Sequence, residues 1–164
     1  MNEPVHPDAR AWKLGSPRWC LALVVVVVID ACSDPCQTPE AEKILQQAAA
    51  EEGAVRTESG LVFRQLRPGV GPTPEPGNRV QVHYEGRLAD GTVFNSSYES
   101  GSPSSFALDR VIPGWAEGLQ LLHGGGKAKL TIPPSLGYGK KGNPPDVPPC
   151  ATLIFEVELL GIYD

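Results

Sequence analysis

The sequence predicts an α+β domain in which an antiparallel sheet of five or six strands is wrapped around one short helix. Three observations lead to this prediction. Glycine and proline occur 18 and 17 times in 164 residues, which is typical of strands joined by tight turns. Apolar residues alternate along several short segments, as they do in half-buried strands. Beyond residue 60, helical spacing is found at Trp115, Leu119 and Leu122.

The expected strands are separated by turn signals. The clearest strand spans 79–88, where Val80, Val82 and Tyr84 face one side and polar residues face the other. An Asp90-Gly91 pair then marks a hairpin turn. The other expected elements are, in chain order, strands at 61–66, 92–97 and 104–109, the helix at 115–122, and strands at 128–132 and 151–162.

The N-terminus has the composition of an export signal. Basic residues precede an apolar run at 20–29, which is shorter than the roughly 20 residues that a membrane span needs. The boundary before Cys32 resembles that of a bacterial lipoprotein, in which this cysteine is lipidated, although Asp30 fits that pattern poorly. We therefore expect a lipoprotein-type signal peptide at 1–31. Cleavage by the ordinary signal peptidase, or an uncleaved anchor, are the alternatives.

A tether with a short helix is expected at 32–60, and the folded domain at 61–164. Thr38 and Pro39 form a sound helix start, and Gly53 is a plausible stop. The helix is short, and without sustained heptads it favours a spacer in a monomer over a dimerisation helix. With Ser33 after Cys32, the lipoprotein pattern implies an outer-membrane lipoprotein that faces the periplasm; a soluble periplasmic protein is the alternative.

Two cysteines remain in the mature chain besides Cys32. Cys36 and Cys150 could form a disulfide in an oxidising compartment, but the sequence does not position them relative to each other. The spacing of Cys32 and Cys36 suits neither a zinc site nor a redox pair.

Several function classes are disfavoured. The net charge of −5 and the lack of a basic patch argue against binding to nucleic acid. The histidines are scattered without metal-ligand spacing, so no metal or other cofactor is expected. The segment HGGGK at 123–127 is not a phosphate loop, because Leu121 and Ala128 stand where that motif needs glycine and serine or threonine.

Four blocks in order resemble the FKBP-type peptidyl-prolyl cis-trans isomerases, including exported bacterial members related to the macrophage infectivity potentiator. The blocks read VQVHYEGRLADGTVFNSS, VIPGWAEGLQLL, KLTIPPSLGYG and PPCATLIFEVELLGI. The resemblance covers about 79–162 and implies a sheet wrapped around a short helix. It also implies an enzyme that isomerises X-Pro bonds of envelope or periplasmic proteins, without a cofactor and with proline-containing polypeptides as clients.

The resemblance implies an apolar pocket between helix and sheet, with Trp115 as its floor. The backbone N–H of Ile112 and the phenol of Tyr138 would each bind a carbonyl of the substrate. Such a pocket would also bind macrolide inhibitors. The expected catalytic residues are Tyr84, Phe94, Asn95, Ile112, Trp115, Tyr138 and Phe155, and the expected substrate-binding residues are Val111, Phe106 and, on a flap above the pocket, Val147.

The sequence departs from the family pattern in two places. Asn95 stands where an aspartate is usual, which keeps an acceptor oxygen but removes a charge, so reduced activity is expected. Asn143 and Asp146 make the flap more polar than in many relatives, which disfavours tight macrolide binding. These departures support an alternative function, that of a non-catalytic module or periplasmic chaperone that binds proline-containing segments.

Overall fold

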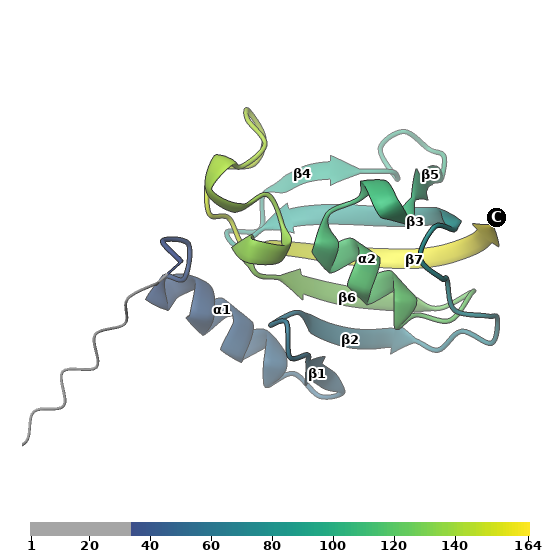
Figure 1. The fold of residues 1–164 in the computed structure, drawn as a ribbon, viewed down its shortest axis with the longest axis horizontal. Helices are drawn as coiled ribbons and strands as arrows, with labels where there is room; N and C mark the ends of the chain where they lie inside the picture. Colours follow the sequence, from purple (N-terminus) through teal and green to yellow (C-terminus); the bar gives the residue numbers. More distant parts are fainter. Residues whose placement is uncertain (1–33) are drawn as a thin grey trace, which may run out of the picture. The chain divides into compact units, whose positions relative to one another are not determined.

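The computed structural model describes residues 34–164. The expected signal peptide and lipidation site at Cys32 lie outside the described residues. The described chain forms one antiparallel sheet of seven strands in the order β1-β2-β6-β7-β3-β4, with β5 paired to β3 (Figure 1). The strands are β1 (Ala54–Arg56), β2 (Val62–Arg67), β3 (Arg79–Leu88), β4 (Val93–Ser96), β5 (Ser104–Ala107), β6 (Lys127–Ile132) and β7 (Leu153–Tyr163).

The two longest strands, β3 and β7, form the centre of the sheet. The predicted alternation of β3 is confirmed, since Val80, Val82 and Tyr84 are buried and the residues between them are more exposed. In β7, Phe155 and Val157 are buried in the same core, and Val157 pairs with Tyr84. Because successive side chains of a strand point to opposite faces, the apolar side chains of both strands face one core.

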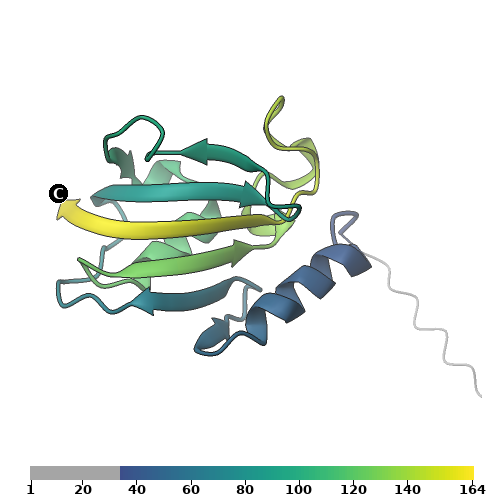
Figure 2. The same cartoon turned by 180° about the vertical axis from the view of Figure 1, so that it is seen from behind.

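Helix α2 (Pro113–Gln120) lies against that face of the sheet, in front of the strands in Figure 1 and behind them in Figure 2. Its proline at the first turn has the fixed φ that a helix start requires. Gly114 and Gly118 face β6, where an added Cβ would come within 2.5 Å of Ile132 and 2.7 Å of Leu130. The absence of these side chains lets the helix approach the sheet closely. The predicted fold class is confirmed.

Helix α1 (Pro39–Ala49) is the expected spacer helix, and it also packs on the sheet. The Thr38 hydroxyl accepts a hydrogen bond from the Ala41 N–H at 3.1 Å and caps the helix. Leu45 and Ala48 contact Val62 in a second, smaller cluster. Because the neighbours of Val62 on β2 join the main core, α1 lies on the face opposite to α2.

An ion-pair cluster holds the chain just after α1. Glu51 lies 2.5 Å from the Arg64 guanidinium and 2.6 Å from the Lys129 ammonium, so it joins this segment to both β2 and β6. None of the helices within residues 34–164 is long and apolar enough to cross a membrane.

Within the part of the chain that the structure describes, three 3₁₀ helices complete the connections around the edge of the core. They are η1 (Leu108–Arg110), η2 (Pro134–Leu136) and η3 (Gly139–Lys141). The sheet has seven strands where five or six were predicted, and β1 is the one that none of the expected strand ranges covers. Val55 and Arg56 are exposed, so this strand has no alternating pattern that sequence could reveal.

A disulfide joins Cys36 to Cys150, with 4.9 Å between their Cα atoms. It connects the segment before α1 to the loop before β7. The Cys150 N–H also donates a hydrogen bond to the Gly139 carbonyl at 2.8 Å. The pairing that the sequence left open is thus present, and it ties α1 to the loop that follows Tyr138.

Replacing both cysteines, in Cys36→Ser/Cys150→Ser, should lower the free energy of unfolding by about 2–5 kcal/mol, because the bridge closes a long loop in the unfolded chain. Thermal and urea unfolding of the two proteins measures this. Added reductant should lower the midpoint of the native protein and leave that of the double variant unchanged. Equal midpoints without reductant would show that the bridge does not stabilise the fold.

Candidate active site

An aromatic cavity of about 250 Å³ opens between α2, the sheet and the loop after β6. Six of its lining side chains are aromatic, and each comes from a different part of the chain. The lining residues are Tyr84 on β3, Phe94 and Asn95 on β4, Phe106 on β5, Arg110 on η1, Val111 and Ile112 before α2, Trp115 on α2, Tyr138 between η2 and η3, and Phe155 on β7.

Trp115 lies where α2 meets the sheet and is only 4% exposed. Its ring meets three others edge to face, at centroid distances of 5.1 Å to Tyr84, 5.4 Å to Phe106 and 5.2 Å to Phe155. Edge-to-face contacts of this kind add to the stabilisation from burial. The indole is therefore held rigidly, with an orientation set by three strands.

The indole N–H of Trp115 is buried and has no hydrogen-bond partner within residues 34–164. An unpaired buried donor costs about 1–3 kcal/mol. The rings around it offer π-faces, which are weak acceptors at best. The cavity thus offers a large flat apolar surface with few polar groups around the indole.

Glycine at position 86 makes room for two of the rings. A Cβ there would lie 2.6 Å from an atom of Phe155 and 2.8 Å from an atom of Phe94. These two rings meet at a centroid distance of 5.4 Å with their planes nearly perpendicular. The close approach of the rings to the β3 backbone thus depends on a residue without a side chain.

Polar groups are few in the cavity. The Tyr84 hydroxyl donates a hydrogen bond to Asn95 Oδ1 at 2.6 Å. Burial raises the pKa of Tyr84 and also that of Tyr138 above the ordinary value for tyrosine, so both phenols stay protonated and can donate at neutral pH. The Ile112 N–H, at the N-cap of α2, has no acceptor within the described residues.

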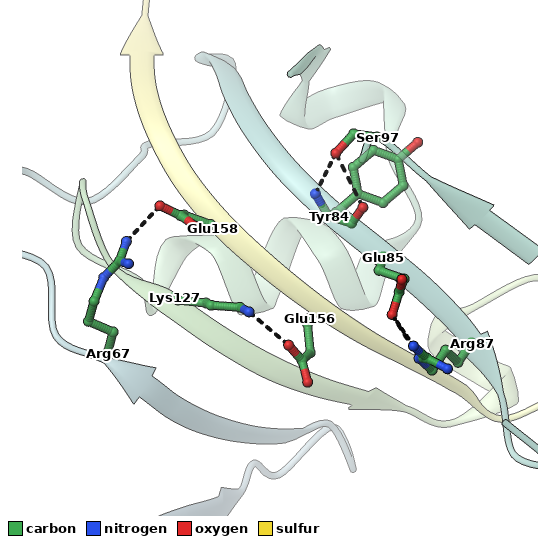
Figure 3. Close-up of polar contacts among 8 residues, drawn as sticks. All are labelled: Arg67, Tyr84, Glu85, Arg87, Ser97, Lys127, Glu156 and Glu158. Atoms are coloured by element: carbon green, nitrogen blue, oxygen red, sulfur yellow. Dashed lines mark hydrogen bonds and ion pairs between the residues drawn. The ribbon is translucent and has the colours of Figure 1, made fainter. Parts of the chain in front are cut away.

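Ser97 fixes the backbone of Tyr84, as Figure 3 shows. Its hydroxyl accepts from the Tyr84 N–H at 2.8 Å and lies 3.2 Å from the Tyr84 carbonyl oxygen, to which it donates. His83 Nδ1 also lies 3.0 Å from this hydroxyl. Ser97 was not among the residues expected at the site. Its burial, at 2% exposed, is the feature that marks it, and burial of a serine just after a strand becomes visible only in the structure.

Of the ten residues expected at the site, the structure brings nine together around the cavity. The exception is Val147, which is 1% exposed and packs within the core cluster. Its backbone pairs with that of Asn143 at 2.8 and 2.9 Å. Asn143 and Asp146 are exposed, as expected for the tip of a polar flap.

Arg110 lines the cavity and was not expected there. It is the single charged residue among the lining residues. Elsewhere, charged side chains pair on the opposite face of the sheet, and Figure 3 shows three such pairs. These pairs are Arg67–Glu158 at 2.7 Å, Lys127–Glu156 at 2.8 Å and Arg87–Glu85.

A second hollow of about 440 Å³ lies between the start of α1 and residues 133–135. It is larger than the aromatic cavity, but none of its lining residues is aromatic, and Arg56 and Glu42 pair across it. The chemistry of the lining residues therefore favours the aromatic cavity as the functional site.

Comparison with known proteins identifies relatives for most of the chain. Residues 71–160 match the family described as FKBP-type peptidyl-prolyl cis-trans isomerase. The FKBP-type 22 kDa peptidyl-prolyl cis-trans isomerase of Escherichia coli K12 is 50% identical over 123 residues, which cover 75% of this chain and 60% of that protein. The macrophage infectivity potentiator of Trypanosoma cruzi is 41% identical over 151 residues, covering 88% of this chain and 77% of that protein.

The fold is also found in solved structures. The crystal structure of FkpA from Escherichia coli matches with a TM-score of 0.73 and 45% identity, covering 76% of this chain and 58% of that one. The matched residues thus span 43% of the length of the FkpA protein and 60% of the length of the 22 kDa relative.

Proposed function

The chain belongs to the FKBP-type peptidyl-prolyl cis-trans isomerase family, and from this premise we propose that it accelerates cis/trans isomerisation of X-Pro bonds in polypeptides. The observation that carries the proposal is the aromatic cavity in which Trp115 meets Tyr84, Phe106 and Phe155. A proline ring is compact and apolar, and the indole gives it a flat apolar surface to pack on.

To accelerate this reaction, the protein has to lower the barrier to rotation about the X-Pro amide bond. Amide resonance gives X-Pro bonds a barrier of about 18–20 kcal/mol, while cis and trans differ by only about 0.5–1 kcal/mol. In the twisted transition state the resonance is broken, so the carbonyl oxygen carries less negative charge and needs water less. A cavity lined mainly by apolar rings therefore favours the twisted amide over the planar one.

The few polar groups would orient the substrate. The Ile112 N–H has no acceptor within the described residues and lies at the cavity, so it can donate to a carbonyl of the bound peptide. A phenol is protonated at neutral pH and burial raises the pKa of Tyr138 further, so its hydroxyl can donate to a second carbonyl. These two donors would hold the peptide in place while its X-Pro bond rotates.

A non-catalytic binding module is the second candidate, and Asn95 is the observation that favours it. Asn95 accepts the Tyr84 hydroxyl hydrogen bond, but it brings no charge to the cavity. The same cavity could hold a proline-containing segment without a strong effect on its rotation. A chaperone of this kind would bind proline peptides and isomerise them at close to the uncatalysed rate.

We also propose export to the cell envelope, based on the signal-like composition of 1–31 and on Cys32. Lipidation of Cys32 would anchor the protein to the outer membrane, facing the periplasm. A disulfide between Cys36 and Cys150 suits an oxidising compartment of this kind. Mass spectrometry of the mature protein should find an acylated N-terminal Cys32, and an unmodified N-terminus would contradict the anchor.

Tyr138→Phe should lower kcat/KM on a proline peptide about three- to tenfold, because one hydrogen bond to the substrate is lost. A protease-coupled isomerase assay of the whole protein measures this. Tyr163→Phe is the matched control, since Tyr163 is exposed at the end of β7 and its hydroxyl contacts only Gln81 among the described residues. Equal rates for the two variants would remove Tyr138 from the mechanism, and native activity at background would favour the binding module.

Asn95→Asp should raise kcat/KM about two- to tenfold, because a carboxylate at this position accepts the Tyr84 hydroxyl more strongly and places a negative charge beside the twisting amide. The same assay measures the effect, with binding of a proline peptide followed in parallel by calorimetry. An unchanged rate would show that the charge at this position has no role in this chain.

A further inference from the structure

We propose that Arg110 makes the cavity selective for X-Pro bonds next to an acidic side chain. The inference rests on the proposed function and specifies its substrate class. The cavity is largely apolar, yet its lining contains one cation, Arg110, and no carboxylate.

Arg110 is placed at the cavity by the local fold. It ends the 3₁₀ helix η1, two residues before Ile112, whose N–H is available to the substrate. The side chain is exposed, so its guanidinium can reach a peptide that enters from solvent. A substrate held by the Ile112 N–H would therefore pass close to this charge.

The guanidinium has no fixed partner. Arg56, Arg64 and Arg67 each form an ion pair with a glutamate, whereas Arg110 forms no ion pair and no side-chain hydrogen bond within residues 34–164. Its neighbour Asp109 is exposed and does not line the cavity. A substrate carboxylate would therefore bind Arg110 without first breaking a bond inside the protein.

The surroundings leave the positive charge largely uncompensated. Asn95 is neutral and its side-chain oxygen already accepts the Tyr84 hydroxyl. The loop after Tyr138 adds the exposed Lys140 and Lys141, against one acid in the same loop, Asp146. The residues that line the cavity thus carry one positive charge and no negative charge, in a chain whose net charge is −5.

Physical chemistry sets the size of the effect. The planar guanidinium can form two parallel hydrogen bonds to a carboxylate, which lysine cannot match in geometry. Because the Arg110 side chain is exposed, its attraction for a carboxylate is modest and sensitive to salt. It affects how fast and how selectively a substrate binds more than it affects rotation of the bond. We therefore expect selectivity to appear in KM and kcat/KM.

Two series of otherwise identical peptides test the proposal, one with Glu, Gln or Lys directly before the proline and one with them directly after it. The whole protein should show a Glu-to-Lys ratio of kcat/KM of about three to ten in at least one series at low salt. The ratio should fall toward one at about 1 M salt, where screening is strong.

Variants then assign the effect to this side chain. Arg110→Gln should bring the ratio close to one, Arg110→Glu should invert it, and Arg110→Lys should keep part of it. The matched control is Lys43→Gln, which removes one positive charge from an exposed position on α1, away from the cavity. That variant should keep the native ratio.

The outcomes separate the two proposals. A ratio of one in both series, with clear isomerase activity, would overturn the role of Arg110 and leave the proposed function standing. A ratio that Lys43→Gln alters as much as Arg110→Gln does would show that net charge is responsible, and would also overturn it. Background rates on every peptide would instead contradict the proposed function.

Discussion

The close packing of α2 against β6 is the constraint on which the rest of this domain depends. Gly114 and Gly118 leave room for Ile132 and Leu130 of β6. A side chain at either glycine position would collide with the strand. The helix can therefore lie low on the sheet, and Trp115 reaches the rings of β3, β5 and β7 at once. Protein interiors are packed so densely that one added methyl group at either glycine would disturb these contacts.

The cavity is a consequence of this packing, because the rings that surround it are also part of the core. Tyr84, Trp115 and Phe155 are buried core residues and cavity walls at the same time. Their rigidity comes from neighbours that do not line the cavity, such as Ser97 behind Tyr84. The rings of the cavity are therefore held in place by the same packing that stabilises the sheet.

Much of this arrangement could be predicted from the sequence, because periodic burial and the four family-like blocks both depend on local residue order. The residues that were missed act through contacts between distant segments. Arg110 was not among the expected residues, because only the position of η1 in the fold places it at the cavity, and Val147, expected on a flap, is instead buried among residues of the main core. The disulfide and β1 depend on tertiary proximity, for which the sequence carried no periodic signal.

The bridge between Cys36 and Cys150 also determines how the domain would carry mechanical load. A pull on the chain ahead of Cys36, opposed at the C-terminus, passes through the disulfide to Cys150 and then along β7. Every residue between the two cysteines is outside this force path, including α1, α2 and almost all of the cavity. Tension applied in this way would bear on one central strand, and the aromatic cavity would stay assembled until that strand was pulled out of the sheet.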